Sequence, residues 1–195
     1  MKQLSIRGLV MSSLFAALLV MVSFIKVQVT GSAVPITLQT LVVMLAGVFL
    51  GPLYGFLSIF LVVLLTALGL PMIGGFGGIS VLLGATGGYI LTWPLASLLI
   101  GLMVRRAQGA GTKAFLLTFA AAELFGSWLV YAGGVPWYAQ VKQMSMSAAF
   151  VQGCLPFLIP DAVKAAITAL IAVPIKQVYS TERLTGGSQA QVAEL

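Results

Sequence analysis

The sequence contains no histidine, a single cysteine and few charged side chains, and each shortage excludes a class of function. Without histidine, neither a Ser–His nor a Cys–His nucleophile pair can form, and a transition-metal site built from the chain alone is disfavoured. Cys154 has no second cysteine for an intrachain disulfide, and we interpret it as a small packing residue. We therefore predict a protein that is not an enzyme and that uses no metal and no cofactor.

Charged residues are so scarce that the chain must be solvated by lipid. They make up 7% of the 195 residues, and hydrophobic residues make up 60%, whereas soluble domains average about 25% charged residues. The net charge of +6 is not arranged as a basic stripe with interleaved aromatic residues, so it does not indicate a nucleic-acid partner. The composition predicts an integral membrane protein of one domain, embedded in a bilayer.

Apolar stretches separated by glycine and proline predict an all-α protein with six transmembrane helices. The second expected helix is short and ends at the segment GPLYG, and the start of the sixth is blurred by two prolines. The expected spans are 8–25, 35–50, 55–70, 81–104, 114–132 and one within 149–175.

The basic residues are unevenly distributed between the two sides of these spans. With the N-terminus in the cytoplasm, the outer side holds only Lys26 and Lys142, and Lys164 lies within a span. Because lysine and arginine favour the cytoplasmic side, we predict that both termini are cytoplasmic. Residues 1–180 then form the single six-helix domain, and residues 181–195 form a polar cytoplasmic tail. The inner side receives Lys2, Arg7, Arg105, Arg106, Lys113, Lys176 and Arg183.

Asp161 and Lys164 stand inside the last apolar stretch, LPFLIPDAVKAAITALIAVPI. A charge near the bilayer centre costs at least about 2.5–3.5 kcal/mol on insertion scales, so an intramembrane ionisable residue is a candidate functional site. On a helix, residues three apart share one face. The two side chains either neutralise each other or face a ligand cavity, and we favour the ligand site. If Pro160 lies at the start of the helix, Asp161 falls in the first turn, where a carboxylate is favoured.

Other residues carry weaker signals. Glu123, inside the fifth span, has no cation near it in sequence, so it is neutral, pairs with Lys164 or faces water. Gln39 can bond across helices or to a ligand. Trp128 and Tyr131, three residues apart, are candidates for a pocket wall, whereas Trp137 and Tyr138 fit an interfacial aromatic belt.

The first helix contains two overlapping pairs of small residues spaced by four. They are Ser12 with Ala16 and Ser13 with Ala17. Such spacing makes a smooth strip on which another helix packs closely. The strip either packs within the bundle or contacts a partner subunit.

Three motifs, in the order VPITLQTLVVMLAGVFLGPLYG, LGLPMIGGFGGISVLLGATGGY and PFLIPDAVKA, resemble the BioY family of biotin-binding S components of energy-coupling-factor (ECF) transporters. The resemblance covers roughly residues 12–172. It implies a six-helix S-component fold with a biotin pocket near the outer face, capped by the first and third loops. It also implies a transmembrane coupling subunit and two ATPase subunits as partners, although some members work alone or as oligomers.

The resemblance also assigns roles to residues. The family's paired Asp and Lys correspond to Asp161 and Lys164, its Gly-Gly-x-Gly-Gly loop to residues 74–78, and its tyrosine after paired glycines to Tyr89. Its first-helix coupling strip corresponds to Ser13 and Ala17. Four positions depart from the common pattern: Phe76 offers no side-chain hydrogen bond, Ala85 replaces a proline, Pro160 replaces a glycine and Ser13 replaces an alanine. The resulting substrate-binding set is Asp161, Lys164, Tyr89, Gly75, Phe76, Gly77, Gln39, Trp128 and Tyr131.

The resulting prediction is the substrate-specific subunit for biotin uptake across a prokaryotic plasma membrane, energised by partner ATPases. An ionised Asp161 suits the ureido N–H groups of biotin, and Lys164 suits the ureido carbonyl or the valerate carboxylate. Two alternatives stay open. The chain is a standalone carrier for biotin or another small anionic vitamin, or an intramembrane enzyme with Lys164 as base, for which no serine is suitably placed.

Overall fold

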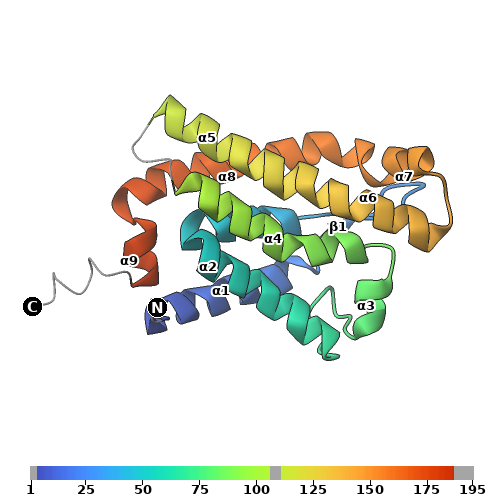
Figure 1. The fold of residues 1–195 in the computed structure, drawn as a ribbon, viewed down its shortest axis with the longest axis horizontal. Coiled ribbons are helices and arrows are strands. Elements are labelled where there is room, and N and C mark those ends of the chain that lie inside the picture. Colours follow the sequence, from blue (N-terminus) through green and yellow to red (C-terminus); the bar gives the residue numbers. More distant parts are fainter. Residues whose placement is uncertain (1–3, 106–110, 187–195) are drawn as a thin grey trace, which may run out of the picture.

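The computed structural model of the chain describes residues 4–105 and 111–186. These residues form an elongated bundle of helices with short connections (Figure 1). Two strands of two residues each, β1 (Lys26–Val27) and β2 (Ile36–Thr37), pair antiparallel in the first long loop and are the one departure from an all-α fold in the described residues. The helices are α1 (Ile6–Val22), α2 (Gln39–Ala67), α3 (Ile79–Leu83), α4 (Gly87–Val104), α5 (Thr112–Glu123), a π-helical turn η1 (Leu124–Trp128), α6 (Leu129–Lys142), α7 (Met146–Gly153), a 3₁₀ turn η2 (Leu155–Phe157), α8 (Leu158–Val178) and α9 (Thr181–Thr185).

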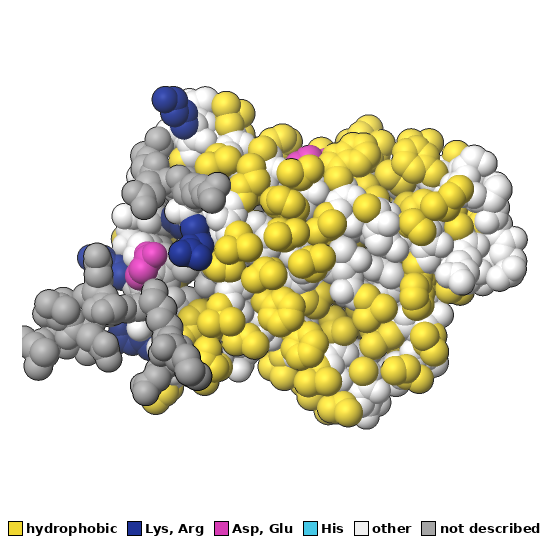
Figure 2. Space-filling view, viewed as in Figure 1, with side chains coloured by type: hydrophobic (Ala, Val, Ile, Leu, Met, Phe, Trp, Pro, Cys, Tyr) yellow, Lys and Arg dark blue, Asp and Glu magenta, His cyan; other side chains and the backbone are white. Residues whose placement is uncertain are grey.

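Within the described residues, four helical stretches are long and apolar enough to cross a membrane. They are Gln39–Ala67, Gly87–Val104, Thr112–Lys142 and Met146–Val178. The first helix, α1, is apolar but has 17 residues, fewer than the about 20 that a straight span needs. Large hydrophobic side chains are exposed along most of the bundle, as a lipid-facing surface requires, and Figure 2 shows them covering the middle of one face.

Helix α2 folds back on itself at Gly51. This residue has φ 74° and ψ −173°, a conformation open to glycine, and Pro52 follows it without an N–H to continue the helical ladder. A Cβ atom on Gly55 would lie 2.9 Å from the carbonyl oxygen of Ala46, nine residues earlier. In a straight helix these residues would be about 13 Å apart along the axis. The two halves of α2 therefore run side by side, which matches the second and third expected spans.

The two halves of α2 pack against α4 at very short range through glycine. A Cβ atom on Gly47 would lie 2.6 Å from the carbonyl oxygen of Ser97, and one on Gly101 would lie 2.5 Å from the backbone nitrogen of Pro52. No side chain fits between the backbones at these points. This is the small-residue packing typical of helices in membranes, where close van der Waals contact replaces the hydrophobic effect.

The fifth expected span, 114–132, proves to be ten residues longer at its outer end. Helices α5 and α6 form one continuous rod through η1, and the outer segment expected as a loop is helical up to Lys142. As a result, Tyr138 is not in an interfacial belt. It is buried, it accepts a hydrogen bond from the Ala33 N–H at 3.2 Å, and it donates one to Gln152 Oε1 at 3.1 Å. The Trp137 indole donates to the carbonyl of Gly84 at 2.9 Å.

The sixth expected span is interrupted near its outer end. Helix α7 ends at Gly153, the turn η2 redirects the chain, and α8 begins at Leu158. Pro160 is the third residue of α8, where its missing N–H removes no helical hydrogen bond. Asp161 therefore lies in the first turn of α8, as expected.

The first and last described helices meet at one end of the bundle. The Ser5 hydroxyl donates to the carbonyl of Thr185, and the Ser5 N–H donates to the Tyr54 hydroxyl at 2.8 Å. Figure 2 shows lysine and arginine side chains gathered at this end. The expected tail thus begins with a packed helix, α9, while Lys2, Arg106 and residues 187–195 lie outside the described residues.

Candidate functional site

A cavity of about 360 Å³ opens between the helices at the end of the bundle opposite α9. This volume lies in the range of small-ligand pockets, roughly 300–1,000 Å³. Its floor comes from α2, α4, α6 and α8, and its rim comes from the β1–β2 hairpin and the loop between α2 and α3. The lining residues are Ser23, Lys26, Val34, Pro35, Thr37, Gln39, Thr40, Ile73, Gly74, Phe76, Ser80, Val81, Gly84, Thr86, Tyr89, Ile90, Trp93, Val130, Tyr131, Phe157, Asp161 and Lys164.

Asp161 and Lys164 form a buried ion pair in the wall of this cavity. Their side chains are one helical turn apart on α8, and Lys164 Nζ lies 2.6 Å from Asp161 Oδ1. The Tyr131 hydroxyl, from α6, donates to Asp161 Oδ2 at 2.5 Å. Lys164 also donates to Thr40 Oγ1, from α2, at 3.0 Å. Three helices thus supply one polar network, and both charges are paired, as buried charges must be.

Two other polar groups of the cavity have no partner among the described residues. Gln39 Nε2 and Trp93 Nε1 are buried donors without a hydrogen bond. Their residues are 5% and 4% exposed, and both line the cavity. An unsatisfied buried donor costs about 1–3 kcal/mol. A ligand that brings an acceptor oxygen to these nitrogens would recover that free energy.

Tyr89 lines the cavity through its ring. Its hydroxyl is occupied, because it donates to the carbonyl of Gly153 at 2.9 Å. A Cβ atom on Gly134 would lie 2.3 Å from this ring, so the absence of a side chain at this position of α6 leaves room for the ring. Tyr89 therefore offers an apolar face to a ligand, and its polar atom braces the junction of α7 with η2.

The glycine-rich loop closes over the cavity from the outside. The Gly74 N–H donates to Ser23 Oγ at 2.7 Å, which ties this loop to the end of α1. Phe76 lines the cavity while remaining 62% exposed. Gly75 and Gly77 are not among the lining residues. A Cβ atom on Gly77 would lie 2.2 Å from the carbonyl oxygen of Leu70, so this glycine serves the fold of the loop.

Trp128 is the predicted pocket residue that lies away from the cavity. It is 48% exposed on the outside of η1, and its ring meets that of Tyr131 edge to face at 6.0 Å. Trp128 is the last residue of η1, and Tyr131 follows it on α6. Trp128 therefore supports Tyr131 from behind.

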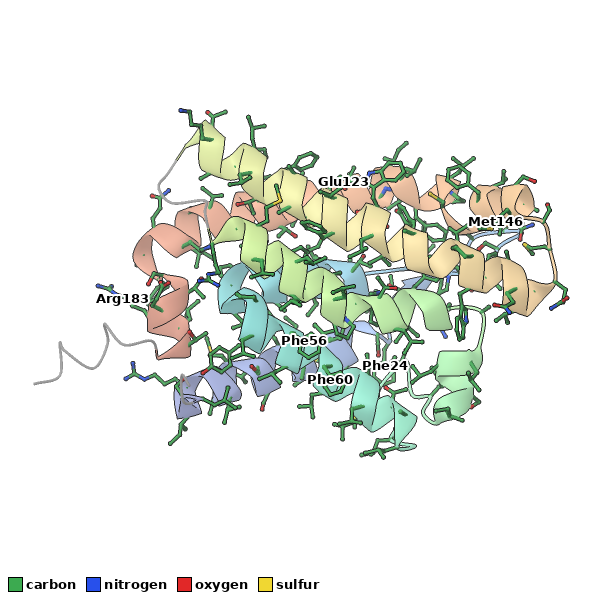
Figure 3. All side chains as sticks on the ribbon, in the orientation of Figure 1. Phe24, Phe56, Phe60, Glu123, Met146 and Arg183 are labelled. Carbon is green, nitrogen blue, oxygen red and sulfur yellow. The ribbon has the colours of Figure 1, made fainter. Side chains whose placement is uncertain are left out.

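Glu123 also lies outside the cavity. It ends α5, midway along the α5–α6 rod, where Figure 3 labels it. Its Oε2 accepts a hydrogen bond from Ser127 at 3.1 Å, and no ion pair joins it to Lys164 in the described structure.

The two small-residue pairs of α1 have different environments. Ser12 and Ala16 are buried, and the Ser12 hydroxyl donates to the carbonyls of Gly8 and Tyr54. Ser13 and Ala17 are exposed, with the Ser13 hydroxyl satisfied by the carbonyl of Leu9 at 3.0 Å. The first pair therefore packs inside the bundle, and the second is free to contact another molecule.

Many lining residues are absent from the predicted binding set, and three of them carry a charge or a polar group that the site uses. Thr40 follows Gln39 directly and carries a hydroxyl, but one threonine among many gives no signal. Trp93 lies one helical turn after Tyr89, and this spacing was available as evidence. Lys26 was assigned to the outer side by topology alone, and nothing in the sequence indicated that its loop folds over the cavity.

Comparison with known proteins places this geometry in a family. The model of the BioY family matches residues 1–181. A probable biotin transporter BioY of Pyrococcus horikoshii is 42% identical over 148 residues, which cover 75% of this chain and 83% of that protein. The biotin transporter BioY of Rhodobacter capsulatus is 36% identical, and the alignment covers 93% of this chain and 99% of that one.

A solved structure agrees with the sequence comparisons. The crystal structure of the S-component for biotin from an ECF-type ABC transporter superposes with a TM-score of 0.82 at 28% identity, covering 88% of this chain and 92% of that chain. The fold, the sequence similarity and the family model point the same way: this chain belongs to the BioY family.

Proposed function

We propose that this chain binds biotin and is the substrate-specific subunit for biotin uptake across a prokaryotic plasma membrane. The observation that carries the proposal is the cavity wall, where a buried Asp161–Lys164 pair stands beside two unpartnered donors, Gln39 and Trp93. Membership of the BioY family and the similarity to a biotin S-component support biotin as the ligand. The role is binding and translocation, not catalysis.

The chemistry of the wall suits the ureido ring of biotin. An ionised Asp161 is an acceptor only, so it fits the two ureido N–H groups. The ureido carbonyl needs donors, which Gln39 Nε2, Trp93 Nε1 and the remaining N–H of Lys164 supply. The sulfur-containing ring and the alkyl chain lie against Tyr89 and other apolar residues of the lining. Without ligand, Lys164 and Tyr131 hold the carboxylate in position.

Six membrane spans with both termini in the cytoplasm are part of the proposal. The fold-back of α2 at Gly51 divides one of the four long apolar stretches into two, and α1 adds a further apolar helix. Each of the described basic residues at the α9 end belongs to a helix terminus there, whereas Lys26 and Lys142 lie at the cavity end. By the positive-inside rule, the cavity then faces the outside of the cell. In this proposal residues 1–180 form one membrane domain.

A transmembrane coupling subunit and two ATPase subunits are the proposed partners. Support comes from the structural neighbour, an S-component of an ECF-type ABC transporter, and from the exposed Ser13 and Ala17 on α1. A ligand held in a capped cavity needs a conformational change for release on the other side. ATP hydrolysis by the partners would drive it. A carrier that works alone or as a homo-oligomer is the alternative.

Titration of the purified chain in detergent with biotin, desthiobiotin and lipoate tests the proposed ligand. Desthiobiotin keeps the ureido ring, whereas lipoate keeps a ring sulfur and a carboxylate but has no ureido group. We expect biotin to bind most tightly, desthiobiotin to bind, and lipoate not to compete. Equal binding of lipoate and biotin would show that the cavity recognises a generic anionic vitamin.

A further inference from the structure

The cavity contains two lysines, and they stand at opposite ends of it. Lys164 is buried on α8 within the bundle, and Lys26 is exposed on β1 in the outer loop. The Lys26 ammonium lies 5.6 Å from the centre of the Phe76 ring. In the part of the chain that the structure describes, Lys26 has no carboxylate partner. The ligand proposed above also has two different ends, a neutral ureido ring and a carboxylate.

The inner lysine is poorly suited to a carboxylate. Lys164 is neutralised by Asp161 at 2.6 Å and gives a second N–H to Thr40 at 3.0 Å. The pair therefore has no net charge. A ligand carboxylate brought to Lys164 would approach the Asp161 carboxylate as well, and two like charges at short range disfavour ionisation of both. The inner end selects a neutral group that can donate to Asp161.

The outer lysine has the opposite properties. Lys26 keeps its positive charge in contact with water, so a carboxylate that binds there loses little hydration. Its position is fixed, since Lys26 pairs with Thr37 in the β1–β2 hairpin and Thr37 also lines the cavity. Phe76 reaches the same place from the glycine-rich loop, which the Ser23–Gly74 hydrogen bond holds against α1. The rim thus presents one uncompensated cation above a neutral interior.

We propose that Lys26 binds the carboxylate of the ligand at the mouth of the cavity, so that biotin enters with its ureido ring inward and its valerate chain outward. The proposal rests on the proposed function and adds a ligand orientation and a specificity residue. On binding, the ammonium moves from the face of Phe76 to the carboxylate, and Phe76 remains as an apolar cover over the chain.

A comparison of biotin with biotinamide, its neutral carboxamide, isolates this contact. Both are titrated against the purified full chain, the Lys26→Met variant and the Lys142→Met variant. Methionine keeps an unbranched apolar stem over Phe76 while removing the charge. Lys142 is a matched control, because it is an exposed lysine at the same end of the bundle that does not line the cavity.

We expect the wild-type chain and Lys142→Met to prefer biotin over biotinamide by about fivefold, the size of a partly solvated ion pair. Lys26→Met should lose that preference through weaker biotin binding, with biotinamide affinity unchanged. A preference that survives in Lys26→Met would overturn the proposal, as would equal losses for both ligands, which would assign Lys26 to the loop structure alone. Failure of the wild-type chain to bind either ligand would instead overturn the proposed function.

Discussion

The two ends of the bundle are built differently. At the α9 end, glycines bring backbones together, with a Gly101 Cβ position only 2.5 Å from Pro52 N, and α9 packs across the start of α1. At the other end, the same helices spread around a cavity of about 360 Å³ with a polar wall and unpartnered donors. One end is packed to exclude everything and the other is built to receive a small molecule. Access from a single side is the starting state of a transporter that must change conformation.

The largest expected effect concerns biotin uptake and the exposed strip of Ser13 and Ala17 on α1. We expect Ala17→Trp to abolish biotin uptake by cells that hold the full transporter, because a bulky ring on the exposed strip blocks close helix contact. Biotin binding by the purified chain should stay near wild type. The paired measurement is cellular uptake of labelled biotin beside a binding titration.

The neighbouring position is the control for this strip. Ala16 is 5% exposed inside the bundle, so Ala16→Trp should reduce the amount of folded protein and lower binding and uptake together. If Ala17→Trp behaves in the same way, the strip is internal packing and the coupling role fails. If uptake survives Ala17→Trp, the chain works without a partner on this face.

The second largest effect should occur in the cavity. Asp161→Asn keeps the shape of the side chain but replaces an acceptor with an amide that presents N–H groups to the ureido N–H groups. The loss of a charge-assisted hydrogen bond costs about 1.5–3 kcal/mol, or roughly 10- to 150-fold in biotin affinity. A Glu123→Gln variant is the matched control, since that carboxylate lies outside the cavity. Equal losses in both variants would mean that any intramembrane carboxylate matters, whatever its position.

At the packed end, the expected effect is on stability and not on affinity. Gly101→Val would overlap the Pro52 backbone, and overpacking of this kind costs about 1–3 kcal/mol of unfolding free energy. Ala120→Val, on an exposed position of α5, should cost far less. Thermal unfolding in detergent measures both, and biotin titration of the surviving folded fraction should give wild-type affinity. A change in affinity would show that the two ends are energetically coupled in the resting state.

The smallest effect should come from the hydrogen bond between the start of α1 and Tyr54 of α2. Tyr54→Phe removes the acceptor of the Ser5 N–H, worth about 0.5–1.5 kcal/mol. Tyr179→Phe, at an exposed tyrosine, is the control and should leave the unfolding transition in place. A loss of biotin affinity in Tyr54→Phe would show that the α9 end contributes to binding, which would contradict the division into a packed end and a binding end.

Much of this organisation followed from the sequence, for identifiable reasons. Composition fixed the membrane class, and the spacing of Asp161 and Lys164 placed both side chains on one face of α8, where the structure has them 2.6 Å apart. Gly51 and Pro52 marked the turn within α2. These are local properties, so helical periodicity and backbone chemistry were enough to predict them.

What the sequence could not provide depends on contacts between distant segments. The extension of α6 to Lys142 carries Tyr138 into the core, where its hydroxyl joins residues from two other segments. The position of Lys26 depends on the pairing of two strands of two residues each, too short a pattern to be predicted from the sequence. Trp128 precedes Tyr131 by three residues yet is largely exposed and does not line the cavity, so the spacing alone could not tell which of the two side chains faces the ligand site.

The central claim is that Asp161 and Lys164 serve a ligand and do not merely neutralise each other. The most direct test is the biotin affinity of the double variant Asp161→Asn with Lys164→Met, beside the two single variants and a folding control. We expect the double variant to fold and to bind biotin no better than the weaker single variant, because the groups that hold the ureido ring are gone. Recovery of near-wild-type affinity in the double variant would contradict the claim and reduce the pair to a device for carrying two charges into the membrane.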